Sequence, residues 1–415
     1  PRKGIYSALS LILICSSTVQ AGVAPHNKAH SHKRSSHARH SSRVFAVTGT
    51  SKHVDQSPPL AEMEGYVIQD ASGKVIQSSN ASEKFNPAST LKLATALLAL
   101  RRYGPETILS TRLTYSGKID KDGQLDGDLF LLGGNPLFKR GMAQRFAKEL
   151  NDKGIRSVKG NIYVSSDLRF DNVSGVEAGQ KIKTLWESAP IRYSRKRKQN
   201  IAIGSRVAIS GDVQIGEAKP DSLEVCTQVT PKMKTLLKLM LCYSINGIAD
   251  ELGNMMGGPQ KLNNFVVNSI HVDKNDASFS SCSGLGINRI TPLAMAKIIT
   301  ALRADLKLHH YDLTDILPVA GVDAGTLEKR FTAPDRSGTV VAKTGTLIQT
   351  DSGVSALAGE MKTKNDGPLT FVIFEQHGSV MKFVKRQEEI VLKTQDEHGG
   401  PDKLVYQPVD LSFFD

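Results

Sequence analysis

Residues 86–105 read NPASTLKLATALLALRRYGP and predict a buried helix. Asn86 is a good N-cap residue, and the fixed φ of Pro87 suits the first helical position. Leucine and alanine occupy nearly every side of the segment that follows, so we expect the helix to lie inside the protein. Arg101-Arg102 suits its negative C-terminal end, and Gly104-Pro105 ends it.

The polar side chains of this apolar helix include Ser89 near its start and Lys92 three residues later. The backbone N–H of Ser89 should lack an intrahelical acceptor, so together with the positive helix end it can stabilise an oxyanion. The three-residue spacing places the stem of Lys92 on the same face as Ser89. A buried lysine loses its proton more readily, and the neutral amine can then take the proton of the Ser89 hydroxyl. The alternative is a capping serine beside a lysine that extends to solvent.

Two later motifs supply further groups that such a nucleophile needs. Ser244-Ile245-Asn246 precedes an apolar helical stretch over residues 248–256, and Lys343-Thr344-Gly345-Thr346 lies on a β-branched run. Gly345 has no side chain, so a ligand can approach the edge of this strand. The order Ser-x-x-Lys, Ser-x-Asn, Lys-Thr-Gly, each in its expected secondary structure, indicates a serine acyl-transfer site.

Composition and pattern divide the chain into segments. Residues 1–21 read as a signal peptide, with a buried N-terminal helix as the alternative. Residues 22–55 are rich in His, Ser and basic residues and predict a disordered linker, with an irregular His-rich metal tract as the alternative. A catalytic domain is expected over 56–104 and 236–415. An inserted accessory domain over 105–235 should interrupt it.

The strand and helix patterns predict an α+β fold. One antiparallel sheet flanked by helices should form the catalytic domain, with a C-terminal helix over residues 380–393. The insert should be a smaller α/β domain with a helix over residues 140–152, and whether it contacts substrate stays open. The expected strands cover residues 65–70, 74–77, 353–361 and 369–374 in the catalytic domain and 111–115, 127–132 and 160–164 in the insert.

Composition also excludes several classes of protein. With 415 residues, 40% hydrophobic and 23% charged, the chain is neither a disordered polymer nor a fibrous repeat. The net charge is +12, and the residues before 56 together with the cluster Arg192–Lys198 equal all of it, so the rest of the chain is balanced. We therefore expect no nucleic-acid interface. The basic segments suit peripheral contact with an anionic wall polymer or membrane surface.

No later segment has 18 consecutive apolar residues, so no transmembrane helix is expected after the signal peptide. Export predicts a periplasmic location and an oxidising compartment. Cys226, Cys242 and Cys282 would remain there, which allows at most one disulfide. No pair of Cys residues has zinc-ligand spacing, and His-Glu-x-x-His is absent, so neither a metal site nor another cofactor is predicted.

The three motifs in this order make the chain resemble the penicillin-recognising serine enzymes. In particular it is similar to the low-molecular-mass penicillin-binding proteins of the class C type, D-Ala-D-Ala carboxypeptidases and endopeptidases with a large insert after the first motif. The resemblance covers roughly residues 60–395. Further matching stretches are Gly123–Pro136, Ser283–Leu285 with Asn288–Pro292, and Leu317–Leu327. It implies a β-lactamase/transpeptidase-like catalytic domain, peptidoglycan stem peptides as substrates and inhibition by β-lactam antibiotics.

The resemblance also implies a mechanism. Ser89 would attack the carbonyl between the two terminal D-Ala residues and form an acyl-enzyme, with Lys92 as the general base. Ser244 would relay the proton to the leaving amine, and Asn246 would hold the amide of the substrate. Water would then hydrolyse the ester.

The Lys-Thr-Gly strand would bind the terminal carboxylate of the substrate. Lys343 would supply positive charge that also helps to keep Lys92 neutral, and Thr344 and Thr346 would hydrogen-bond the carboxylate. The backbone N–H groups of Ser89 and Thr346 would form the oxyanion hole.

The sequence departs from the pattern of this family at three places. Ile245 stands where Asp is usual, Ser281-Cys282 where Asp-Gly is common, and Asn135 where Asp is usual. Two other functions stay open. A secreted β-lactamase would share the nucleophile, but we identify no Glu or Tyr base for rapid deacylation. A non-catalytic wall-binding protein on the same scaffold would account for the basic segments and the motif departures.

Overall fold

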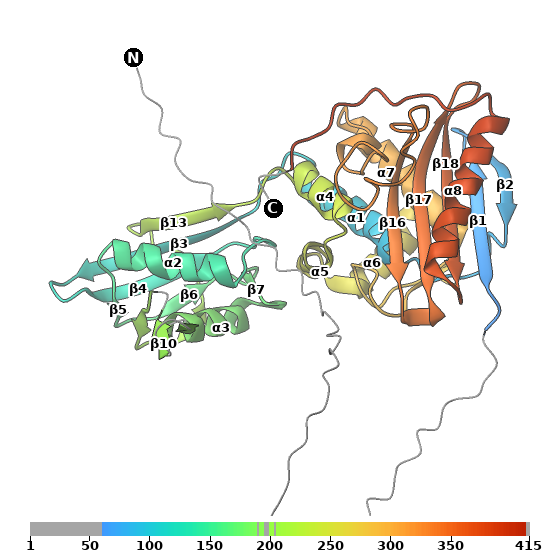
Figure 1. Ribbon diagram of the computed structural model, residues 1–415. Coiled ribbons are helices and arrows are strands. Elements are labelled where there is room, and N and C mark those ends of the chain that lie inside the picture. The colour runs from blue at the N-terminus through green and yellow to red at the C-terminus, as the bar shows by residue number, and fades with distance from the viewer. Residues whose placement is uncertain (1–59, 189–190, 195–198, 203–204, 412–415) are drawn as a thin grey trace, which may run out of the picture. The chain divides into compact units, whose positions relative to one another are not determined.

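This computed structural model describes residues 60–188, 191–194, 199–202 and 205–411 (Figure 1). The chain divides into two units, and the unit Leu60–Pro408 holds the elements described below. The predicted signal peptide (1–21), the predicted linker (22–55) and four of the basic residues, 195–198, lie outside the described residues.

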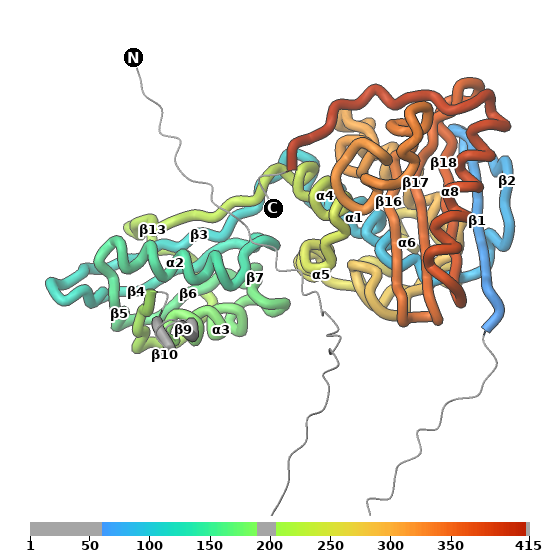
Figure 2. Tube along the Cα trace, viewed as in Figure 1, coloured from blue at the N-terminus to red at the C-terminus, as the bar shows by residue number. Residues whose placement is uncertain are grey.

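A five-stranded antiparallel sheet is the centre of the catalytic part. Its order is β16-β17-β18-β1-β2, so strands from the two ends of the sequence are neighbours, and Figure 2 shows β1 in blue beside β18 in red. Nearly every residue of β17 and β18 is buried, because both faces of these strands are covered. The strands are β1 (Met63–Gln69), β2 (Val75–Ser79), β16 (Val340–Leu347), β17 (Val354–Thr363) and β18 (Gly367–Gln376).

Helices cover both faces of this sheet. In Figure 1, α8 lies on one face, where it packs against β17, and α7 lies on the other, against β18 and β1. Helix α1 contacts α4, α5, α6 and α7 and is buried from Lys92 to Leu100. The predicted sheet flanked by helices is thus confirmed. The helices are α1 (Lys92–Tyr103), α4 (Met233–Cys242), α5 (Asn246–Met255), α6 (Gly258–Ile270), α7 (Pro292–Leu308) and α8 (Val380–Glu397), with 3-10 turns η1 (Ala88–Leu91), η2 (Leu313–Asp315) and η3 (Thr350–Ser352) and a short pair β14 (Ala277–Ser278) and β15 (Arg289–Ile290).

A second sheet lies in the sequence between α1 and α4. Its path is β11-β5-β4-β3-β13, with β6 between β4 and β12, and it combines antiparallel and parallel pairs. The predicted smaller α/β unit is therefore present. Its strands are β3 (Ser110–Ile119), β4 (Gln124–Leu132), β5 (Ser157–Val158), β6 (Ile162–Val164), β11 (Ala208–Ile209), β12 (Val213–Ile215) and β13 (Leu223–Val229); its helices are α2 (Arg140–Asp152) and α3 (Gly175–Glu187); and two small pairs are β7 (Arg169–Phe170) with β8 (Val173–Ser174) and β9 (Ile191–Ser194) with β10 (Gln199–Ala202).

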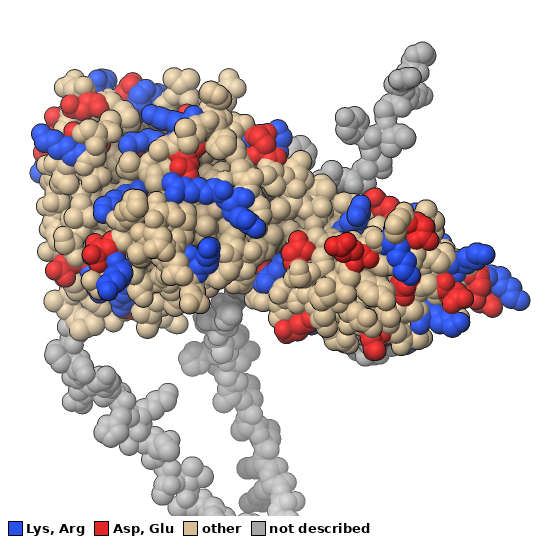
Figure 3. Space-filling view, turned by 180° about the vertical axis from the view of Figure 1, so that it is seen from behind, with Lys and Arg blue, Asp and Glu red and all other residues tan. Residues whose placement is uncertain are grey.

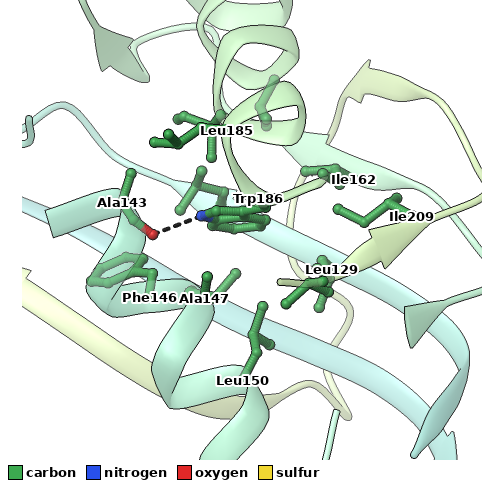
Figure 4. Close-up of a cluster of buried hydrophobic side chains, with 14 of the residues drawn as sticks. Leu129, Ala143, Phe146, Ala147, Leu150, Ile162, Leu185, Trp186 and Ile209 are labelled. Carbon is green, nitrogen blue, oxygen red and sulfur yellow. Dashed lines mark hydrogen bonds between the residues drawn. The ribbon is translucent and has the colours of Figure 1, made fainter. Parts of the chain in front are cut away.

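The core of this second unit surrounds Trp186 on α3, which is fully buried among aliphatic and aromatic side chains (Figure 4). Its indole Nε1 donates a 2.6 Å hydrogen bond to the carbonyl of Ala143 on α2. A buried indole N–H needs such a partner, and here the bond also joins the two helices.

The helix predicted to begin at Asn86-Pro87 begins later. Ala88 has φ of +45°, which an α-helix cannot accommodate, and the regular α-helix starts at Lys92 after the 3-10 turn η1. Asn86 still accepts a hydrogen bond from the backbone N–H of Ala88. Ser89 consequently lies in a turn that leads into α1 and not inside the α-helix itself.

No helix in the described part of the chain is long and apolar enough to cross a membrane. Figure 3 shows basic and acidic side chains interspersed on the face that it presents.

Candidate active site

The turn η1 and the first residue of α1 bring Ser89 and Lys92 into contact. Lys92 Nζ lies 2.9 Å from Ser89 Oγ, and the Lys92 side chain is fully buried. Because Lys92 follows Ser89 by three positions at the start of α1, the two side chains can lie on the same face of the chain. The alternative of a lysine that extends to solvent is therefore wrong.

Two further oxygens surround the amine of Lys92. Asn246 Oδ1 lies 2.7 Å from Nζ, and the carbonyl oxygen of Ser283 lies 2.7 Å from it. Asn246 is the first residue of α5, and Ser283 belongs to the loop before β15. The first two motifs thus meet at one nitrogen atom.

Burial changes the acid–base chemistry of Lys92. It lowers the pKa of this amine from 10.5 to about 7, while the carboxylate of Asp250 acts weakly in the opposite direction. A large fraction of Lys92 is therefore neutral at physiological pH and can accept a proton from Ser89.

Strand β16 lies directly against the nucleophile turn. A Cβ atom added at Gly345 would lie 2.8 Å from the carbonyl oxygen of Pro87 and 3.0 Å from the backbone N of Ser89. Only glycine permits this approach without displacing the strand. The Lys-Thr-Gly motif is thus beside Ser89.

The 281–289 loop also lies against the nucleophile turn. Gly284 has φ of +89°, and a Cβ atom there would lie 1.8 Å from the carbonyl oxygen of Ala88. In the sequence, Ser283-Gly284-Leu285 is a stretch that matches the family, but the match assigns it no function. In the structure it supplies an acceptor for Lys92 and packs against the nucleophile turn.

Lys343, the lysine of β16, is fully buried, and its Nζ donates 2.7 Å to the carbonyl of Thr344. Burial, with the nearby Lys92 amine as the second cause, holds the pKa of Lys343 well below its usual 10.5. A bound carboxylate would favour the protonated form again. Thr344 is half-buried and Thr346 is exposed, so both can meet a ligand at the strand edge.

Ser244 occupies the corner between α4 and α5 with φ of +56°. The backbone N–H of the next residue, Ile245, donates 3.0 Å to the carbonyl of Met240 and closes this corner. Within the described part of the chain, Ser244 Oγ has no hydrogen-bond partner, in contrast to Asn246 two residues later.

The three cysteines in the described residues, Cys226, Cys242 and Cys282, are free thiols. Burial is the main reason that the pKa of each is raised to about 12. Thiols of this kind are poor nucleophiles at neutral pH, so the serine stays the candidate nucleophile.

Comparison with known proteins agrees with the geometry. The sequence pattern of the D-Ala-D-Ala carboxypeptidase 3 (S13) family matches residues 47–177 and 197–395. The chain belongs to this family. S13 membership confirms the resemblance seen in the sequence, and with it an enzyme of the serine-type D-Ala-D-Ala carboxypeptidase class.

Among curated S13-like relatives, carboxypeptidase DacB of Mycolicibacterium smegmatis is 30% identical over 141 residues, which cover 31% of this chain and 30% of that protein. Carboxypeptidase Rv3627c of Mycobacterium tuberculosis is 23% identical over 371 residues, 78% of each chain. The match thus spans about a third of the first relative and most of the second.

Solved structures show the same fold. The predatory endopeptidase Bd3459 of Bdellovibrio bacteriovorus, in complex with an immunity protein, aligns with a TM-score of 0.67 at 22% identity over 85% of this chain and 98% of that one. Penicillin-binding protein 4 of Haemophilus influenzae aligns with a TM-score of 0.59 at 20% identity over 82% and 97%.

Proposed function

We propose that this S13 protein is a D-Ala-D-Ala carboxypeptidase that cleaves peptidoglycan stem peptides through an acyl-enzyme on Ser89. One observation carries the proposal: the Ser89 hydroxyl lies 2.9 Å from the amine of Lys92, where burial lowers the pKa of that amine to about 7. A hydroxyl nucleophile needs such a base at hydrogen-bond distance.

In the proposed first step, the neutral amine of Lys92 takes the proton of Ser89 as its Oγ bonds to the carbonyl carbon. The bond to the terminal D-Ala then breaks, and its amine receives a proton through Ser244. Asn246 would hold the amide of the substrate while it also bonds to Lys92. Water enters in the second step and cleaves the ester, which restores the Ser89 hydroxyl and releases the shortened peptide.

The edge of β16 is proposed to bind the terminal carboxylate of the substrate. Lys343 would be protonated in that complex, and Thr344 and Thr346 would donate hydrogen bonds from their hydroxyls. The backbone N–H groups of Ser89 and Thr346 are the proposed oxyanion hole, in which one donor contributes about 3–4 kcal/mol in comparable enzymes.

Location and partners complete the proposal. Peptidoglycan lies outside the cytoplasm, so the proposed substrate requires export, which the sequence of residues 1–21 favours. Penicillin G acylates the related Bdellovibrio endopeptidase, and we expect β-lactams to acylate Ser89 here. We also propose that the basic segments make peripheral contact with an anionic wall polymer or membrane surface. The inserted domain is proposed to span residues 105–235, within a catalytic domain of residues 56–104 and 236–415.

Labelling with fluorescent penicillin tests this function. The wild type should acquire a long-lived label, and the Ser89→Ala variant should acquire none. Rapid turnover of the drug would support a β-lactamase instead, and an unlabelled wild type would support a wall-binding protein. A D-Ala-D-Ala pentapeptide and a cross-linked muropeptide, supplied separately, then distinguish carboxypeptidase from endopeptidase activity by the released D-Ala or the released monomers.

A further inference from the structure

The backbone immediately before the nucleophile is strained. Ala88 has φ of +45°, a left-handed conformation that crowds the Cβ atom of any residue except glycine. Such a conformation persists only where the surroundings hold it. Since Ser89 follows Ala88 directly, whatever holds this turn also sets the direction of the Ser89 hydroxyl.

Asn86 is the side chain that holds the turn. It is fully buried, and its Oδ1 accepts a 3.1 Å hydrogen bond from the backbone N–H of Ala88. Its Nδ2 donates to the carbonyl of Gly286 at 3.0 Å and to Asp351 Oδ2 at 2.8 Å. One amide thus joins the nucleophile turn, the 281–289 loop and the 3-10 turn η3 that follows β16.

Asp351 is fixed in its turn by a second loop residue. The guanidinium of Arg289 donates to both of its carboxylate oxygens, at 2.7 and 3.0 Å. Burial acts to raise the pKa of Asp351, but the hydrogen bonds from Arg289 and Asn86 outweigh it and lower the pKa. The carboxylate is therefore ionised at neutral pH, and a bidentate ion pair of this kind fixes geometry in addition to charge.

We propose that Asn86 and Asp351 are positioning residues for Ser89. Through Asn86, the Arg289–Asp351 pair holds the strained turn in the conformation that directs the Ser89 hydroxyl to Lys92. Neither residue belongs to the three motifs that mark the active site. The inference rests on the proposed role of Ser89 as the nucleophile.

The chain provides a matched control for the ion pair. Arg101 and Asp305 join α1 to α7 by a bidentate pair as well, through Nε at 2.6 Å and Nη2 at 3.1 Å, whereas Arg289 uses both of its Nη atoms. The exposed fractions of the side chains are also alike, 35% and 16% against 31% and 12% for Arg289 and Asp351. The substitutions Asp351→Asn and Asp305→Asn therefore each remove the charged partner of a bidentate arginine, one beside the nucleophile and one on α7. Asp351 in addition accepts a hydrogen bond from Asn86, a contact that the Asn86→Ala variant tests separately.

The experiment measures acylation by fluorescent penicillin over a range of drug concentrations, at a temperature where circular dichroism shows each variant folded. This separates the acylation rate constant k2 from the dissociation constant K of the initial complex. For Asp351→Asn we expect k2 to fall by ~10- to 100-fold with K nearly unchanged, because a misplaced nucleophile slows the bond-forming step. For Asp305→Asn we expect both constants to match the wild type.

Asn86→Ala should lower k2 to a similar extent. The Asn86→Ala/Asp351→Asn double variant should be little worse than the more damaged single variant, since both changes break one chain of contacts. If Asp351→Asn does not fold, Arg289→Lys replaces it; this change keeps the charge, loses the bidentate contact and should give an intermediate k2.

Three results would overturn the inference. Equal k2 values for Asp351→Asn and Asp305→Asn would mean that the contacts among Asn86, Asp351 and Arg289 do not position Ser89. A higher dissociation constant K with an unchanged k2 would mean that Asp351 or Asn86 contacts the substrate. If the decreases in k2 of the two single variants add up in the double variant, Asn86 and Asp351 act independently and not through one chain of contacts. An unlabelled wild type would instead refute Ser89 as the nucleophile, and this inference with it.

Discussion

At the scale of single residues, the amine of Lys92 is the feature on which the chemistry depends. It is fully buried, and its Nζ lies within hydrogen-bond distance of three oxygens, those of Ser89, Asn246 and Ser283. All three are uncharged, so they orient the amine without the strong stabilisation of the ammonium that a contacting carboxylate would give. Burial therefore dominates, and the pKa of Lys92 falls to about 7.

We predict that acylation of Ser89 rises with pH across the neutral range. Below pH 7 most of Lys92 is protonated and cannot accept the proton of the serine, whereas above it the amine is free. The rate constant k2, measured with fluorescent penicillin, should follow one ionisation with an apparent pKa near 7 and reach a plateau at higher pH. A profile that is flat across this range would exclude Lys92 as the titrating base.

The sequence predicts this pair because Ser89 and Lys92 are three residues apart, a spacing at which helical neighbours share one face. The third acceptor of Lys92 is different. It is the backbone carbonyl of Ser283, 191 positions further along the chain, and any residue type carries a carbonyl group. Only the packed structure reveals such a contact, and the same holds for the amide of Asn86.

At the scale of elements, the site depends on how closely β16 approaches the turn η1. The space that a side chain would need at Gly345 is occupied by the backbone of Pro87 and Ser89. A strand edge at this distance can present Thr344 and Thr346 to a ligand that is bonded to Ser89. The short distance between β16 and η1 is therefore needed for the proposed binding of a ligand at this strand edge.

We predict that Gly345→Ala abolishes most acylation and also destabilises the protein. The new methyl group would meet backbone atoms at 2.8–3.0 Å, so the strand or the turn has to move. Overpacking of this kind typically costs about 1–3 kcal/mol. Penicillin labelling and denaturant unfolding measure the two effects.

Gly141→Ala, on α2, is the control, because a Cβ atom at Gly141 has no neighbour within 4 Å. It should leave labelling unchanged and stabilise the helix by up to about 1 kcal/mol. Normal labelling of Gly345→Ala would show that acylation of Ser89 does not depend on the close approach of β16 to η1.

The elements themselves were largely predictable, but one boundary was not. Hydrophobic patterns indicated β17, β18 and the helix α2, where the predicted range of residues 140–152 matches the structure. The start of α1 was wrong because the positive φ of Ala88 has no signature in the sequence. Alanine is a strong helix former, and tertiary contacts on both sides of the turn override that preference here.

At the scale of the whole described unit, Glu251 on α5 joins the inserted sheet domain to the catalytic part. This carboxylate is almost fully buried and accepts hydrogen bonds from Lys139 at 2.8 Å, Arg169 at 3.1 Å and the backbone N–H of Asn172 at 3.1 Å. Burial acts to raise its pKa, but Lys139 and the other donors outweigh burial and lower it. Because Asn246 begins the same helix, the insert supports an element of the active site.

We predict that Glu251→Gln destabilises the protein by about 3 kcal/mol, since it leaves the buried Arg169 without a counter-charge. Differential scanning calorimetry should show a lower unfolding temperature. The exposed pair Glu177–Lys181 on α3, 3.8 Å apart, provides the control. Glu177→Gln should change the stability by less than about 0.5 kcal/mol. Equal effects of the two substitutions would mean that Glu251 does not join the two parts.

The chain leaves the catalytic part and returns to it through two segments that lie side by side. Three backbone hydrogen bonds join these segments, Thr230 to Leu109 at 2.8 Å, Met233 to Thr107 at 2.8 Å and Lys234 to Pro105 at 3.0 Å. A gene for this protein could therefore lose or exchange the codons between them in a single in-frame recombination, and a short loop would reconnect the ends. Such an arrangement would let the accessory module change in length or sequence while the segments that converge on the nucleophile stay in place.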